Sequence, residues 1–292
     1  MRAVLLLVVA SGCFSPDPPR GLACSASGAC PEGQSCVVGT CVAPGDDASN
    51  PHGGVDLGAH FGIPRVVTSQ RLSGDQYGPS LTSDQLTMFT SGENMSDETD
   101  IYESQSTSMV FSTPLVVSSL ADVQESYDPE VTVDGSFLLF DSPKVPEGIW
   151  YAVRSGTSYT AVQTLLAGKH GPGLADGDAR LFCTDLTSHV FEEYDSSPQG
   201  VSMLRTHEKL AGYEYPSGSQ NGLEVFTMKD HQLYRATRAT LDDQFGAPEK
   251  LTFDAYDFSQ KDDPEISSDG KTLYFSMKNP DSLGFDTYMA TR

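Results

Sequence analysis

Two copies of the tripeptide Asp-Pro-Glu place carboxylates at matching positions in the chain. The copies are Asp128-Pro129-Glu130 and Asp263-Pro264-Glu265. Two carboxyl groups that face each other at a fixed distance can hydrolyse a glycosidic bond, one acting as acid and the other as base or nucleophile. The same groups can instead accept hydrogen bonds from a bound ligand. We therefore predict a ligand-binding role for these carboxylates, with glycan hydrolysis as the alternative, and assign no catalytic residue. The candidates are Asp128, Glu130, Asp263 and Glu265.

Other residue patterns that carry chemistry are missing from the sequence. It has no Gly-x-Ser-x-Gly nucleophile elbow, no His-Glu-x-x-His motif, no Walker loop and no dinucleotide fingerprint. Cys183 falls in an apolar, strand-like stretch, where a thiol is expected to be buried and inert. His189 and His231 hold similar places in a repeat, which explains them better than a shared metal or ligand role. The sequence thus predicts a protein that is not an enzyme, with no metal site and no cofactor.

A repeat sets the positions of these carboxylates. The segment Asp263–Phe275 has a close twin in Asp128–Phe140, and weaker copies run over Pro79–Phe89, Pro172–Phe182 and Pro216–Phe226. In every copy a proline precedes a phenylalanine by ten or eleven residues, and successive phenylalanines are 42 to 51 residues apart. Self-similarity at this period indicates a repeat fold such as a propeller.

Each repeat is predicted to form four antiparallel strands. A β-prone stretch after the proline leads to a tight turn, in which Asp-Gly or Asn-Gly supplies the positive φ that a hairpin requires. These turns are Asp134-Gly135, Asp176-Gly177 and Asp269-Gly270, with Asn221-Gly222 near the same place in the fourth copy. A strand that ends at the phenylalanine follows, and a third strand carries another aromatic residue. A fourth strand in most repeats completes a pattern typical of a propeller blade.

The ends of the repeat region predict how the ring closes. The fifth repeat reaches Arg292 after its third strand, and Phe61–Arg65 matches Phe245–Glu249, which holds the start of a fourth strand. Taking the missing strand from the N-terminal edge gives the last repeat 46 residues, within the range of the others. We predict an all-β fold, a five-bladed β-propeller over residues 56–292, closed by an N-terminal strand.

The repeats resemble the WD40-like, TolB-type (PD40) propeller repeat. The likeness is clearest at Ile266–Phe275, Leu233–Arg238 and Asp286–Arg292. Asp84-Gln85 lacks the turn glycine, and the fourth copy has lost the turn aspartate, so irregular blades are expected there. The resemblance implies the fold strongly and the function weakly. It leaves a TolB-like envelope scaffold as a further alternative.

The N-terminus is predicted to be an export signal. Residues 1–12 carry one arginine, an apolar run and small residues, and the run is too short to span a bilayer. Ala10-Ser11-Gly12-Cys13 resembles a bacterial lipobox, which implies cleavage before Cys13 and lipidation of its thiol; an ordinary signal peptide is the alternative. Residues 13–23 would be a tether to the membrane. Phe14 after the lipid cysteine favours the outer membrane by analogy with enterobacterial sorting.

Four cysteines follow within residues 24–42. Cys24, Cys30, Cys36 and Cys41 are an even number in a short exported segment, which predicts a module with two disulfides. Three pairings are possible. A zinc site is the competitor, but the nearby histidines do not have the usual spacing. The segment resembles the Cys-rich knots that follow the lipobox in myxobacterial-type surface lipoproteins, and residues 43–55 are predicted to be a flexible linker.

The composition limits the partners. The formal net charge is −22 and the pI is about 4.4, which excludes nucleic acid because phosphate binding needs basic groups. The acidity serves solubility, or affinity for cations or a basic partner. We therefore expect a monomeric, lipid-anchored envelope protein whose propeller binds an unidentified protein or glycan.

Overall fold

A computed structural model of the chain describes ten stretches of sequence. They are 35–37, 40–42, 58–67, 74–93, 98–107, 110–120, 125–197, 200–255, 259–279 and 284–292. The chain divides into two compact units, Met1–Asp56 and Leu57–Arg292.

In the first unit the described backbone is a short antiparallel hairpin. β1 (Ser35–Val37) pairs with β2 (Thr40–Val42), and Cys36 stands opposite Cys41 in the register. The predicted signal peptide, Cys13, the tether, Cys24, Cys30 and the linker up to residue 55 lie outside the described residues. The side chains of Cys36 and Cys41 lie outside them too.

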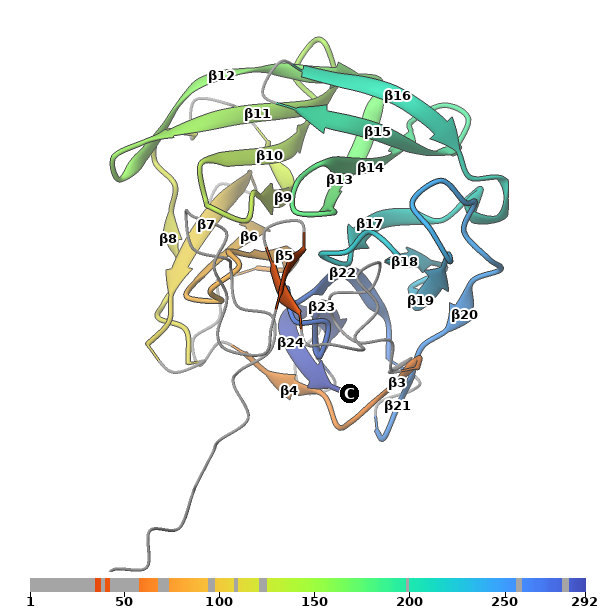
Figure 1. Ribbon diagram of the computed structural model, residues 1–292. Coiled ribbons are helices and arrows are strands. Elements are labelled where there is room, and N and C mark those ends of the chain that lie inside the picture. Colours follow the sequence, from red (N-terminus) through yellow and green to blue (C-terminus); the bar gives the residue numbers. More distant parts are fainter. Residues whose placement is uncertain are drawn as a thin grey trace, which may run out of the picture. The chain divides into compact units, whose positions relative to one another are not determined.

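The second unit contains five four-stranded antiparallel sheets, which follow one another around a ring (Figure 1). The first sheet is β5 (Gln76–Leu81), β6 (Thr87–Glu93), β7 (Thr99–Gln105) and β8 (Leu115–Val116). The second is β9 (Tyr127–Val131), β10 (Phe137–Ser142), β11 (Gly148–Ser155) and β12 (Ser158–Ala167). The third is β13 (Lys169–Ala175), β14 (Arg180–Asp185), β15 (Phe191–Ser197) and β16 (Gly200–Thr206). The fourth is β17 (Glu214–Gly218), β18 (Glu224–Lys229), β19 (Gln232–Thr237) and β20 (Glu249–Lys250).

The fifth sheet combines strands from two distant parts of the sequence. It contains β22 (Lys261–Ile266), β23 (Thr272–Lys278), β24 (Phe285–Thr291) and, as its outermost strand, β4 (Arg65–Val66). Beside it, β3 (His60–Phe61) pairs in parallel with β21 (Thr252–Phe253). The first strands of the sheets touch in an unbroken circle, because β22 also contacts β5. Five sheets around a ring confirm the predicted all-β, five-bladed propeller, and the described residues contain no α-helix, only the 3-10 turn Glu208–Leu210.

The hydrophobic core lies between neighbouring blades. Buried apolar residues form five clusters, one at each interface between adjacent sheets. The five predicted anchors are completely buried: Phe89, Phe140, Phe182, Phe226 and Phe275. They do not end their strands as predicted, since each second strand continues for two to four residues beyond the phenylalanine. Cys183 is buried as expected, and burial raises the pKa of its thiol.

The two repeats predicted to be irregular form ordinary turns, so that prediction was wrong. Gln85 takes the left-handed conformation of the missing glycine, with φ of 56°. Asn221 replaces the missing aspartate, because its side-chain oxygen accepts the Leu223 backbone N–H at 3.0 Å. Asp134 makes the corresponding bond to Ser136 at 2.9 Å. A side chain that can bond two residues ahead therefore preserves the turn without the consensus residue.

Among the residues that the structure describes, no helix has the length and apolar character needed to cross a bilayer.

Candidate functional site

In every blade the innermost strand has an irregularity at the same repeat position. This position holds a residue that is followed by proline. The pairing with the second strand shifts register there in all five blades. The residue before each proline has a positive φ, between 48° and 61°. These residues are Gly78, Asp128, Gly171, Tyr215 and Asp263. A bulge of this kind turns a side chain away from its regular direction, and such bulges often occur beside functional sites.

Three of the five blades carry a strained residue at this position. Glycine adopts a left-handed conformation without penalty, whereas other L-residues lose roughly 1–2 kcal/mol. Gly78 and Gly171 avoid this cost, but Asp128, Tyr215 and Asp263 do not. Strained residues persist where the surrounding structure enforces them, and they gather at binding and active sites.

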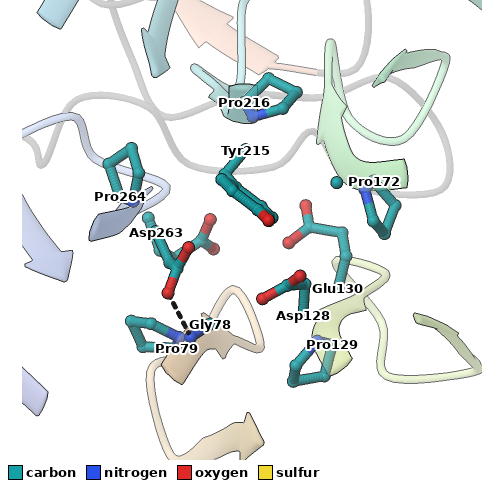
Figure 2. Close-up of a pocket in the computed structure, with 12 residues that line it drawn as sticks. Gly78, Pro79, Asp128, Pro129, Glu130, Pro172, Tyr215, Pro216, Asp263 and Pro264 are labelled. Atoms are coloured by element: carbon teal, nitrogen blue, oxygen red, sulfur yellow. Dashed lines mark hydrogen bonds between the residues drawn. The ribbon is translucent and has the colours of Figure 1, made fainter. Parts of the chain in front are cut away.

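These three side chains converge on the central tunnel. They line a small cavity together with the five prolines and two glutamates. Figure 2 shows Asp128, Glu130 and Asp263 with their carboxylates directed toward the same space, and the Tyr215 ring beside them. The structure thus brings together all four predicted carboxylates, since Glu265 also lines this cavity.

Gly78 lies between Asp128 and Asp263. Its backbone N–H donates to Asp263 Oδ2 at 3.2 Å. A Cβ built on Gly78 would lie 3.1 Å from Asp128 Oδ1. The nitrogen and Cβ of one residue are about 2.5 Å apart, so the two carboxylates lie within about 9 Å of each other.

Burial and mutual repulsion favour the neutral forms of these acids. Burial, followed by the charge of Asp262, raises the pKa of Asp263 to about 7. Burial, with the charges of Asp263, Asp141 and Asp262, raises the pKa of Asp128 well above its usual value. The charge of Asp128, together with burial, raises the pKa of the Tyr215 hydroxyl. Acids perturbed in this way in a cavity are candidates for a functional site.

The two glutamates are already bonded to neighbouring blades. Glu130 accepts the hydroxyl of Ser80 at 3.0 Å and the backbone N–H of Leu174 at 2.7 Å. Glu265 accepts the hydroxyl of Ser217 at 2.7 Å. Because these bonds join different sheets, both glutamates hold blades together beside the cavity. Asp263 also accepts one bond from a neighbouring blade, from the Gly78 N–H. What distinguishes Asp128 and Asp263 is their strained, left-handed backbone, which makes them the better candidates for contact with a ligand.

Sequence reasoning missed a further carboxylate, Asp141. Its Oδ2 accepts the Gly171 backbone N–H at 2.7 Å, while its buried Oδ1 has no hydrogen-bond partner among the described residues. Burial raises the pKa of this carboxyl, and the nearby charge of Asp263 adds to the effect. A signal was present, because Asp141 directly follows the Phe140 anchor, where the other repeats have neutral residues.

The tunnel acids should make the protein less stable as the pH rises. A carboxyl group whose pKa is higher in the folded protein stabilises the fold fully at a pH below its unfolded pKa, near 4. This stability is lost as the pH rises through the folded pKa, here about 7. Asp263→Asn should therefore reduce the loss of unfolding free energy between pH 5 and 8 by on the order of 2 kcal/mol. Urea denaturation across this pH range measures the effect. Asp242→Asn, whose side chain is fully exposed, should leave the pH dependence unchanged.

The fold is shared with solved propeller structures of low sequence identity. A GH43_1 enzyme from Xanthomonas citri superposes with a TM-score of 0.55 at 11% identity, over 78% of this chain and 90% of that one. A GH43 endo-arabinanase from Bacillus licheniformis has a TM-score of 0.50 at 11% identity, and the match covers 75% of this chain and 94% of that one. A putative TolB from Agrobacterium tumefaciens has a TM-score of 0.49 at 15% identity, and the match covers 77% of this chain and 79% of that one. No protein-family model and no curated protein matches the chain. At these identities the likeness establishes the β-propeller fold alone, and any activity must be argued from the site.

Proposed function

We propose that this chain is a lipid-anchored, non-catalytic envelope protein whose propeller binds a protein or glycan at the mouth of its central tunnel. The observation that carries the proposal is the strained conformation of Asp128, Tyr215 and Asp263 around one cavity. Glycine performs the same backbone role in two blades, so the repeat itself does not require these side chains. The presence of these side chains at strained and buried positions supports a role in binding.

The chemistry of the cavity indicates the kind of group that it would bind. Carboxylates crowded in a buried space are stabilised by a cation, or by hydroxyl groups that donate hydrogen bonds. A lysine or arginine side chain of a protein partner would supply the cation, and a sugar would supply the hydroxyl groups. The net charge of −22 also favours a basic partner through long-range attraction.

The proposed location rests on the sequence of the N-terminal segment. The lipobox-like Ala10–Cys13 and the tether at 13–23 support anchoring through Cys13, and Phe14 supports the outer membrane by analogy with enterobacterial sorting. The module at 24–42, with disulfides among its four cysteines, and the linker at 43–55 would hold the propeller away from the bilayer. The pairing of β4 with β24 would close the ring of this monomer and cover the edge that β24 would otherwise expose. A TolB-like scaffold role would use the same anchored arrangement.

Glycan hydrolysis is the second candidate function. The carboxylates of Asp128 and Asp263 are separated by at most about 9 Å, an upper limit within the roughly 5–9.5 Å over which the two carboxyl groups of glycosidases are found. A raised pKa suits one of them to act as general acid at neutral pH. One of the GH43 enzymes of similar fold is named as an endo-arabinanase, but both are only 11% identical to this chain.

Binding screens with a tunnel variant separate these functions. The purified full chain is applied to a glycan array and to an envelope lysate, beside Asp128→Asn/Asp263→Asn. We expect specific binding without product release, weakened at least tenfold in the tunnel variant. Asp242→Asn/Asp254→Asn replaces the same number of carboxyl groups at side chains that are at least half exposed, and should bind normally.

Two other results would change the proposal. Release of sugar products that stops in the tunnel variant would make the protein a hydrolase. Equal binding by the wild type and the tunnel variant would place the binding surface elsewhere on the propeller. Because neutral side chains relieve the repulsion in the cavity, the tunnel variant should remain folded, which thermal denaturation would verify.

A further inference from the structure

A second cluster of functional side chains lies where the third and fourth blades meet. His170 belongs to β13, His189 follows β14, and Glu214 begins β17. One potential ligand atom from each residue lies within 4.8 Å of the other two. The three residues are 19 and 25 positions apart in sequence, so packing of the two blades brings them together.

His170 offers a nitrogen whose bonding is incomplete. Its Nε2 atom is buried and has no hydrogen-bond partner among the described residues. The imidazole packs edge-to-face against Tyr215, with ring centroids 5.6 Å apart, which holds the ring in place. A buried polar atom without a partner is costly, so such an atom calls for a ligand or a functional explanation.

The other two residues form a pair that the repeat explains. His189 Nδ1 lies 3.0 Å from Glu214 Oε1. The next blade interface has the same arrangement, with His231 Nδ1 2.9 Å from Asp262 Oδ1. His189 and His231 both have a left-handed backbone, with φ of 52° and 56°. The pair alone is therefore a feature of the fold, and the added His170 distinguishes the first interface.

We propose that His170, His189 and Glu214 bind a divalent transition-metal ion, for which zinc is the best match. Two imidazole nitrogens and one carboxylate are a common protein ligand set for zinc, at about 2.0–2.2 Å, with a position left open. Calcium and magnesium prefer ligand sets made of oxygen atoms. A modest contraction of the cluster would bring the three atoms within bonding distance of one ion.

The site is accessible and adjoins the tunnel. The side chains of His189 and Glu214 are 57% and 28% exposed, so an ion could enter from solvent and keep an open position toward it. Gly171 and Tyr215, which directly follow His170 and Glu214, line the tunnel cavity. A bound ion would thus lie beside the proposed binding site, although the metal site rests on its own residues and does not depend on that function.

Zinc titration of the full chain tests the proposal. The protein is treated with a chelator, its free thiols are alkylated, and zinc binding is measured by calorimetry. We expect one zinc ion per chain, and a loss of affinity of at least about 100-fold in His170→Ala, which removes a direct ligand. Glu214→Gln should weaken binding while preserving the shape of the site. Cobalt bound in place of zinc should give a visible spectrum without a thiolate charge-transfer band, which separates this site from the cysteine module.

His231→Ala is the matched control, because it removes the equivalent histidine at an interface where the described residues offer no third ligand. It should bind zinc like the wild type, and thermal denaturation should show that all variants are folded. The proposal fails if the wild type does not bind zinc. It also fails if His170→Ala and Glu214→Gln bind zinc normally, or if His231→Ala loses binding to the same extent.

Discussion

Replacing Glu193 by glutamine is expected to destabilise the propeller by about 3–5 kcal/mol, a typical cost of breaking a buried ion pair from one side. Glu193 in β15 is fully buried, as is Arg238 of the next blade. Two guanidinium nitrogens of Arg238 donate to the two carboxylate oxygens, at 2.9 and 3.0 Å. His207 Nε2 lies 3.0 Å from the same carboxylate. Removal of the negative charge leaves a buried guanidinium without compensation, at the interface of the third and fourth blades.

Urea denaturation and thermal melting at pH 7 measure this effect, with an expected fall in Tm of roughly 10 °C. Glu249→Gln is the control, because Glu249 pairs with Arg235 at 2.7 Å but its side chain is 54% exposed. An exposed pair contributes at most about 1 kcal/mol. Equal stability losses in the two variants would show that the buried network does not hold the blades together.

The loss of stability caused by Glu193→Gln should also depend on pH. Burial alone would raise the pKa of Glu193, but hydrogen bonds from His207 and Arg238 outweigh it and lower the pKa to about 2. A carboxyl with a depressed folded pKa contributes its stability above the unfolded value, near 4.5, and loses it as the pH falls through the folded value. The difference in stability between the wild type and Glu193→Gln should therefore shrink between pH 4.5 and pH 2.

Replacing Gly173 by alanine is expected to destabilise the propeller by roughly 3 kcal/mol or more, at the upper end for overpacking. A Cβ at this position would lie 1.9 Å from the carbonyl oxygen of Pro216 and 2.6 Å from its carbonyl carbon. Both atoms are backbone, so a rotamer change cannot relieve the clash. β13 and β17, the innermost strands of two adjacent blades, would have to move apart beside the tunnel.

Chemical denaturation of Gly173→Ala measures the loss. Gly62→Ala is the control, because its added Cβ would lie 3.4 Å from the nearest atom, an ordinary contact. Gly62 should tolerate the change with a loss below about 1 kcal/mol. A Gly173→Ala protein as stable as Gly62→Ala would mean that the blades can separate at low cost.

The repeat pattern made most of the fold predictable. The proline-to-phenylalanine spacing located all five blades, and the five phenylalanines are fully buried because each occupies the same interface in its repeat. The turns were predicted from Asp-Gly and Asn-Gly. The sequence did not reveal that Gln85 would accept a left-handed conformation, because local propensity disfavours it and only the surrounding sheet enforces it.

The candidate site was predicted in part. Matching Asp-Pro-Glu triplets indicated that Asp128 and Asp263 lie at equivalent places in the ring, although 135 residues separate them. A residue before proline normally has an extended backbone, and the left-handed bulge that directs these side chains into the tunnel departs from that preference. The role of Glu130 and Glu265 in joining blades could not be predicted either, since their partners belong to other sheets.

The sequence by itself determined the number of blades, their order and the repeat positions of the acidic residues, because these follow from local patterns that recur along the chain. Only the tertiary structure decided which side chains meet. Closing the ring brings Asp128 next to Asp263, buries Asp141 beside them, and places His170 against His189 and Glu214. Those contacts depend on how adjacent blades pack and on the bulge before each proline. Local sequence preference does not encode either of them.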